Sequence, residues 1–103
     1  MAREATLVQM ECDYAVVDVA NDSTTVYSGP CIYYGAVVTT ALSAQALPIQ
    51  DGTAVIDSFA ASSAVGTAHI WTHGLRCATS LVVDPNDAGS GRITVAYRPI
   101  NPT

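Results

Sequence analysis

The sequence predicts an all-β protein, a single antiparallel β-sandwich or jelly roll of about seven or eight short strands. Runs of β-branched and aromatic residues recur at roughly ten-residue intervals, and turn residues separate them. No heptad repeat and no useful stretch of apolar residues at helical spacing is present. We therefore expect almost no helix, and one domain over residues 1–103 with flexible ends at 1–5 and 99–103.

The opening strand is predicted from Val8 to Val16, where apolar and polar residues alternate. This period-2 pattern is typical of a strand with one buried and one solvated face. The residues expected on the buried face are Val8, Met10, Cys12, Tyr14 and Val16. Asn21-Asp22-Ser23 then predicts a turn into a short strand from Thr24 to Tyr27, which we expect at a sheet edge.

The third strand is predicted from Cys31 to Thr40, after the turn residues Ser28-Gly29-Pro30. Regular alternation divides its apolar residues between two faces, with Ile32, Tyr34, Ala36 and Val38 on one and Tyr33 and Val37 on the other. A strand that is apolar on both faces is central in its sheet or covered by a neighbour.

The middle of the chain is predicted as loop, strand and connection in turn. Ala41 to Leu47 is compatible with one helical turn, and Pro48 marks a loop. Asp51-Gly52 then predicts a tight hairpin into a strand from Thr53 to Phe59. The small residues from Ala60 to Gly66 indicate a flexible connection.

Three further strands are predicted in the last third of the chain. Two of them, Thr67 to Thr72 and Leu75 to Asp84, lie on either side of Gly74. Turn-forming residues then fill Asp84 to Gly91, after which apolar and polar residues alternate from Arg92 to Arg98. We interpret the last two strands as the arms of a long β-hairpin that Pro99 and Pro102 end.

Composition limits the classes of function. Half of the residues are apolar and only 13% are charged, so little charge is present to cover a monomer, and we expect association with other subunits. The net charge of −5 leaves no basic stripe for nucleic acid and disfavours anionic membranes. No apolar run approaches the roughly 20 residues of a transmembrane helix, and the first residues lead into no signal-peptide core. We expect synthesis in the cytoplasm.

The three cysteines, Cys12, Cys31 and Cys77, are widely spaced and form no C-x-x-C pair. Neither a disulfide framework nor a zinc knuckle is indicated. We interpret them as buried, reduced thiols, with one opportunistic pair as the alternative.

Three groups of residues have some features of a metal or catalytic site, but none of them predicts one. His69 and His73 share a strand face at roughly 13 Å, too far for one ion, so an interface or structural row around Trp71 is favoured. Glu11 and Asp13 have a spacing compatible with the acid and base of an inverting glycosidase, but they are typical of a solvated strand face. The turn from Asp84 to Gly89 lacks the ligands of an EF-hand, and an irregular calcium site of Asp84, Asn86 and Asp87 is the alternative to a turn-capping role. With no catalytic motif present, we expect neither an enzyme nor a cofactor.

Four segments of the sequence resemble segments of small structural proteins from tailed-bacteriophage virions. They are Ser28 to Gly35, Thr40 to Ala44, Ile49 to Gly52 and Ser80 to Asp87, and the resemblance covers most of Ser28 to Pro99. It implies a capsid decoration or cement protein, a type that is small, β-rich and often trimeric. Such proteins clamp neighbouring capsomers of the major capsid protein from outside the head. The implied location is the capsid surface, after assembly in the host cytoplasm.

The residues expected to make capsid contacts are aromatic residues in strands and apolar residues in one loop: Tyr33, Tyr34, His69, Trp71, Leu47 and Ile49. The connection from Ala60 to Gly66 is a further candidate. Each of these has a core or connector role as its alternative. The alternative function is a non-catalytic binding module of the virion, in the tail or neck or as a carbohydrate-binding sandwich. A β-sandwich without a virion role is the third interpretation.

Overall fold

The computed structural model describes residues 12–20, 23–85 and 89–100, and this part of the chain contains strands and no helix. No segment of it is therefore a helix able to cross a membrane. The strands are β1 (Asp13–Asp18), β2 (Thr24–Ser28), β3 (Cys31–Thr40), β4 (Leu47–Asp51), β5 (Ala54–Phe59), β6 (Ala68–Cys77), β7 (Ser80–Val83) and β8 (Arg92–Pro99). Several predictions fall outside the described residues: the flexible end 1–5, residues 101–103 of the other end, Val8 to Glu11, Asn21 and Asp22, and Asn86 and Asp87.

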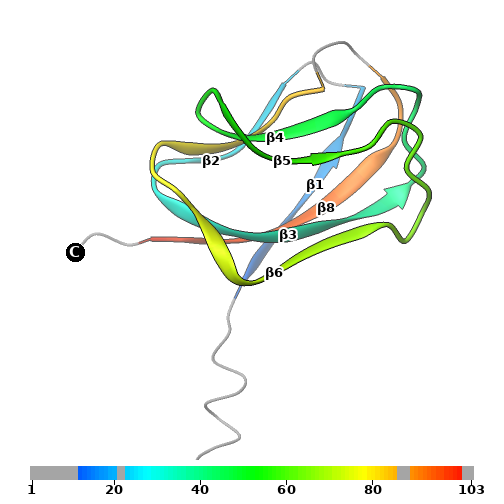
Figure 1. Cartoon of the computed structure of the whole chain (residues 1–103). Helices are drawn as coiled ribbons and strands as arrows, with labels where there is room; N and C mark the ends of the chain where they lie inside the picture. Colours follow the sequence, from blue (N-terminus) through cyan, green and yellow to red (C-terminus); the bar gives the residue numbers. More distant parts are fainter. Residues whose placement is uncertain (1–11, 21–22, 86–88, 101–103) are drawn as a thin grey trace, which may run out of the picture.

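The strands form two four-stranded antiparallel sheets that face each other (Figure 1). Sheet A has the order β1-β8-β3-β6, and sheet B has the order β2-β7-β4-β5. The first strand pairs with the last, the second with the seventh, the third with the sixth and the fourth with the fifth. This is the pairing of one long antiparallel ribbon that is rolled into two sheets. This connectivity is that of a jelly roll, which confirms the predicted fold class.

The predicted hairpin between the last two strands is wrong. β7 pairs with β2 and β4 in sheet B, whereas β8 pairs with β1 and β3 in sheet A. The connection between them, residues 84–91, is long enough to cross the roughly 10 Å between packed sheets. Turn residues mark where a strand ends, but they do not specify which sheet the next strand joins.

The segment from Ala41 to Gln50 is not a helical turn followed by a loop, because β4 begins at Leu47 and lies between β7 and β5 in sheet B. Pro48 stands inside this strand opposite Ser58. The predicted hairpin at Asp51-Gly52 is confirmed, since β4 pairs antiparallel with β5 and Gly52 has a φ of 63°. The predicted edge position of β2 is also confirmed.

The predicted boundary between two strands at Gly74 is wrong, because β6 continues through Gly74 to Cys77. The predicted strand from Leu75 to Asp84 is divided between the end of β6 and β7. The register of β6 with β3 jumps from Gly35 opposite Ile70 to Tyr33 opposite Leu75, so the residues between Ile70 and Leu75 bulge out of the ladder. Gly74 has a φ of 76°, and a Cβ there would lie 2.3 Å from the Cγ2 atom of Ile32. Gly74 therefore allows a bulge over β3 and does not end the strand.

The buried faces of β1 and β3 differ from those predicted. In β1 the buried residue is Val17, while Tyr14 and Val16 are 74% and 69% exposed. Alternation separates the two faces of a strand, but the register with β8 decides which one is buried. In β3 the irregularity between Tyr33 and Gly35 shifts the alternation, and the residues facing the core are Cys31, Tyr33, Ala36 and Val38.

The core lies between the sheets and contains Cys31, Phe59, Cys77, Ile93 and Val95, each fully buried. Burial of Cys31 and Cys77 as reduced thiols is confirmed, and Cys12 is only partly buried. The predicted flexible C-terminal end starts too early. Pro99 belongs to β8, and the backbone N–H of Ile100 donates to the oxygen of Pro30 at 3.0 Å.

Candidate functional site

Three of the predicted contact residues are core residues. Tyr33, Leu47 and Ile49 are 0%, 1% and 0% exposed. Leu47 and Ile49 belong to the central strand β4, and Tyr33 faces inward from β3. Their side chains belong to the buried core cluster and are not accessible to a partner, so the predicted surface role is wrong for these three.

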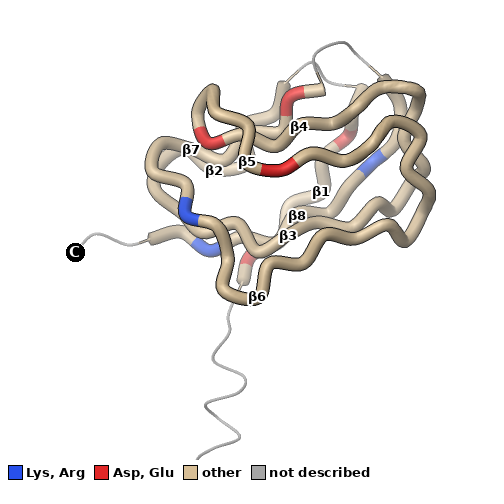
Figure 2. The backbone as a smooth tube through the Cα atoms, viewed as in Figure 1, with Lys and Arg blue, Asp and Glu red and all other residues tan. Residues whose placement is uncertain are grey.

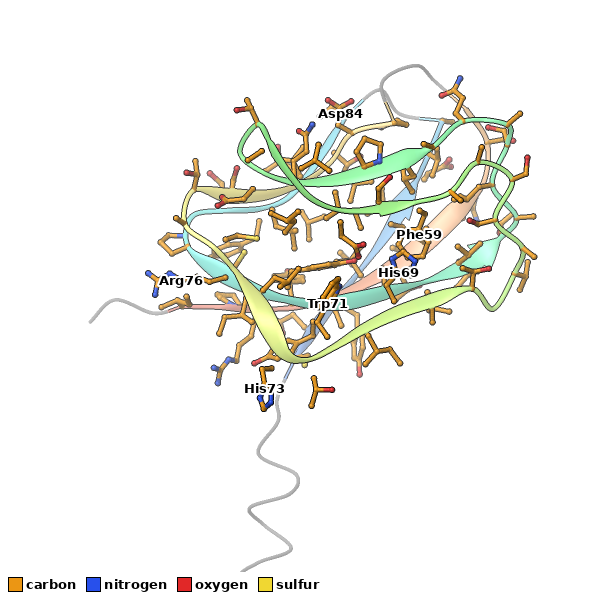
Figure 3. All side chains as sticks on the ribbon, viewed as in Figure 1. Phe59, His69, Trp71, His73, Arg76 and Asp84 are labelled. Carbon is orange, nitrogen blue, oxygen red and sulfur yellow. The ribbon has the colours of Figure 1, made fainter. Side chains whose placement is uncertain are left out.

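The other predicted residues lie at two different places. Tyr34 is partly buried on the outside of sheet A, where it lines a surface hollow. His69 and Trp71 extend from β6 toward β5, at the open edge of the sandwich. Figure 3 shows His69 beside Phe59, whereas His73 projects away from the body of the protein. The strand geometry therefore does not bring the two histidines to one point.

Asp57 on β5 gathers His69, Trp71 and Tyr33 into one hydrogen-bonded network. Its carboxylate accepts from the hydroxyl of Tyr33 at 2.8 Å and from the indole N–H of Trp71 at 3.2 Å. The Nδ1 atom of His69 lies 2.9 Å from Oδ1. The backbone N–H of Ser58 donates to the same oxygen at 2.8 Å. Four donors therefore converge on one carboxylate that joins β5 of sheet B to β3 and β6 of sheet A.

The network is packed as well as hydrogen-bonded. The Asp57 side chain is only 7% exposed, and the imidazole of His69 stacks on Phe59 with ring centroids 4.0 Å apart. Burial, and then the carboxylate of Asp57, raises the pKa of the Tyr33 hydroxyl. The described residues contain no group of three or more His, Cys, Asp or Glu side chains placed to hold a metal ion. The arrangement fits a structural clasp between the sheets.

A second feature is the outer face of sheet A, the side turned away from sheet B. Two rows of residues cross all four strands there. One row is Tyr14, Ala96, Gly35 and Ile70, and the next is Val16, Thr94, Val37 and Ala68. Tyr14, Val16 and Ile70 are 74%, 69% and 80% exposed. We call these eight residues the outer apolar face.

The centre of the outer apolar face is hollow. In the first row, the small residues Gly35 and Ala96 lie between the large residues Tyr14 and Ile70. The hollow has a volume of about 320 Å³, and it is lined by Tyr14, Tyr34, Gly35, Ala36, Val37, Ala68, His69, Ile70, Thr94 and Ala96. Gly35 is needed at its floor, because a Cβ there would lie 2.0 Å from the backbone oxygen of His69.

Arginines flank the outer apolar face at both ends. At one end, Ile32 of β3 pairs with Arg76 of β6 on one side and with Arg98 of β8 on the other. Neither arginine forms an ion pair within the described residues. Arg92 at the other end lies 3.7 Å from Asp18. Figure 2 shows the arginines on sheet A, which also carries Asp13 and Asp18 on β1, whereas the strands of sheet B carry Asp51 and Asp57 and no arginine. The basic charge without an ion pair therefore lies at the Arg76 and Arg98 end of the apolar face.

No protein-family model, no curated protein and no solved structure matches this chain. The fold assignment therefore rests on the strand order. The sequence pattern contained the signal for the exposed face, because Tyr14 and Val16 alternate with smaller or polar residues. Without the strand register, that alternation was assigned to the core.

Proposed function

We propose that this chain is a non-catalytic structural protein of a tailed-bacteriophage virion. In this proposal it decorates the outside of the capsid and stabilises contacts between capsomers of the major capsid protein. It acts as a homo-oligomer, with a trimer as the favoured state. The observation that supports the proposal is the outer apolar face, through which the protein would bind the shell.

The physical argument starts from the cost of leaving that face in water. Monomeric soluble proteins rarely expose contiguous apolar patches beyond a few hundred Å². Burying a valine or isoleucine side chain is worth about 1.5–3 kcal/mol before the costs of association are subtracted. Val16 and Ile70, on the two edge strands of sheet A, are mostly exposed. Most of their burial free energy would therefore be gained when a partner covers them.

The chemistry of the face favours a protein partner over a sugar. Its hollow is lined mainly by aliphatic and small residues, and its polar side chains are those of two tyrosines, one threonine and His69, whose Nδ1 atom is already bonded to Asp57. Sugar recognition needs several convergent polar groups beside an aromatic platform. The indole N–H of Trp71, a candidate for such a platform, already donates to Asp57. The basic end of the face suits an apolar surface with carboxylates at its margin.

The mechanism is differential binding. A subunit, or a trimer of subunits, that touches two capsomers at once binds the closed, expanded lattice and cannot bridge capsomers that have separated. Binding therefore lowers the free energy of the closed lattice relative to the separated state. Linked contacts strengthen this effect, because the second contact forms at a high effective concentration.

The test is co-sedimentation of the purified protein with expanded heads of the phage that encodes it. The double variant Val16→Asp/Ile70→Asp places charge on the outer apolar face at two exposed positions. Its control is Val55→Asp/Val65→Asp, which changes two valines that are 58% and 64% exposed on β5 and in the β5–β6 connection. We expect the first variant to lose at least about tenfold in affinity and the control to bind like the wild type.

Equal loss in both variants would contradict the assignment of the face. If the wild type itself fails to bind heads, the capsid proposal is wrong and the alternative of a tail, neck or carbohydrate-binding module takes its place. A titration with soluble glycans, followed by the fluorescence of the single tryptophan, separates the carbohydrate-binding version. A decoration protein gives no change in that titration.

A further inference from the structure

Two buried thiols face each other across the ladder between β3 and β6. Cys31 is the first residue of β3, Cys77 is the last residue of β6, and the two are directly opposed in the antiparallel register. Both are reduced and fully buried. The two thiols are near enough to affect each other's pKa. This is the opportunistic pair that the spacing of the cysteines left open.

The backbone geometry at this pair suits a disulfide. Directly opposed residues of antiparallel strands have Cα atoms about 4.5 or 5.5 Å apart, depending on whether the pair is hydrogen-bonded. Disulfides span Cα separations of about 4.4–6.8 Å. The Cβ atoms of such pairs, about 4.5–5.5 Å apart, need only a small approach to reach disulfide distance.

We propose that Cys31 and Cys77 form a redox site that closes into an intramolecular disulfide under oxidising conditions and staples the edge strand β6 to β3. With a peroxide as oxidant, one thiolate attacks a peroxide oxygen and becomes a sulfenic acid, and the first water leaves. The second thiol attacks that sulfur, the S–S bond forms, and the second water leaves. Two thiols and one peroxide thus give one disulfide and two waters, with two electrons passing from sulfur to oxygen.

The surroundings make this oxidation slow while the fold is closed. Burial raises the pKa of Cys77 from 9.0 to about 12 and also raises the pKa of Cys31. Few thiolates therefore exist at neutral pH, and the oxidant reaches them only when the strand ends open. β6 pairs with β3 alone, but the opening that exposes Cys77 must also break the bonds that the backbone N–H groups of Ala78 and Thr79 donate to Asp51. The pair stays reduced in a reducing cytosol and closes after longer exposure to an oxidising medium.

The test uses the Cys12→Ser variant, in which only the proposed pair remains, treated with hydrogen peroxide under native conditions. We expect an intact mass lower by about 2 Da and loss of both alkylation sites after denaturation. The chain has arginines at positions 3, 76, 92 and 98 and no lysine. Trypsin therefore separates the fragment 4–76 from the fragment 77–92, and only a disulfide between Cys31 and Cys77 keeps them joined in this variant.

Closure should also raise the melting temperature by at least about 5 °C, since the staple closes a long loop of the unfolded chain, and dithiothreitol should reverse the shift. The Cys12→Ser/Cys77→Ser variant should show neither the mass loss nor the shift. Two alkylated thiols after oxidation, sulfinic or sulfonic acid without a link, or disulfide-linked dimers would each overturn the proposal. None of these measurements depends on capsid binding, so the inference stands or falls separately from the proposed function.

Discussion

Replacing Asp57 by alanine should cost the protein a large part of its stability. The substitution removes the acceptor of three side-chain donors, and the hydroxyl of the fully buried Tyr33 loses its partner. An unsatisfied buried polar group costs about 1–3 kcal/mol, and hydrogen bonds to a charged group contribute about 1.5–3 kcal/mol each. We expect a loss of about 3–5 kcal/mol, against a total of about 5–15 kcal/mol for a typical domain.

The assay is urea unfolding followed by circular dichroism, with the fluorescence of Trp71 as a second probe. The matched control is Asp18→Ala, which removes a carboxylate that is 46% exposed and lies 3.7 Å from Arg92. An exposed pair of this kind contributes at most about 1 kcal/mol. Tyr33→Phe, made in the wild type and in the Asp57→Ala variant, completes a double-mutant cycle for this pair. A loss below about 1 kcal/mol for Asp57→Ala, or no coupling to Tyr33, would refute the clasp between the sheets.

Three further predictions concern a glycine and the two ends of the pH scale. Gly35→Ala places a Cβ 2.0 Å from a backbone oxygen at a φ of 132°, so it should destabilise by at least about 2 kcal/mol. Gly66→Ala, at a φ of 93° with no atom within 4 Å, should cost only about 1–2 kcal/mol in thermal melts, and equal losses would contradict the close approach. Burial raises the pKa of Cys77 from 9.0 to about 12 and also that of Tyr33, so the folded state holds protons that the unfolded state releases. Stability should be complete below pH 9.0 and fall as the pH rises toward about 12, and a urea midpoint that stays constant over this window would count against the burial. Asp51 accepts hydrogen bonds from backbone N–H groups, and the one from Thr79 contributes most. These bonds hold the pKa of the Asp51 carboxyl below 3.8. Its contribution is present above pH 3.8 and is lost as the pH falls through the lowered pKa, so Asp51→Ala should flatten the acid limb of the stability curve.

The sequence was sufficient for the fold class because the strand signals are local. Alternation from Arg92 to Arg98 predicted the strand that the structure contains as β8, and Asp51-Gly52 predicted a hairpin that it also contains. The sheet partners were not predictable in the same way. The turn from Asp84 to Gly91 looks the same whether the next strand returns to the same sheet or crosses to the other one.

The candidate surface depended on register, and a single sequence does not give register. Tyr14 and Val16 were assigned to the core because they are the larger residues of an alternating strand, yet their partners in β8 place them outside. The extra residue between Tyr33 and Gly35 reversed the faces of β3 in the middle of the strand. The Asp57 network was invisible for a related reason, since its side chains come from three strands that are distant in the chain.

The most direct test of the central claim is a cryo-electron microscopy reconstruction of expanded heads incubated with the purified protein. The proposed function predicts added density at capsomer junctions, oriented so that Tyr14, Val16 and Ile70 face the shell. Density that contacts the shell through sheet B, or heads that remain undecorated at saturating protein, would contradict it.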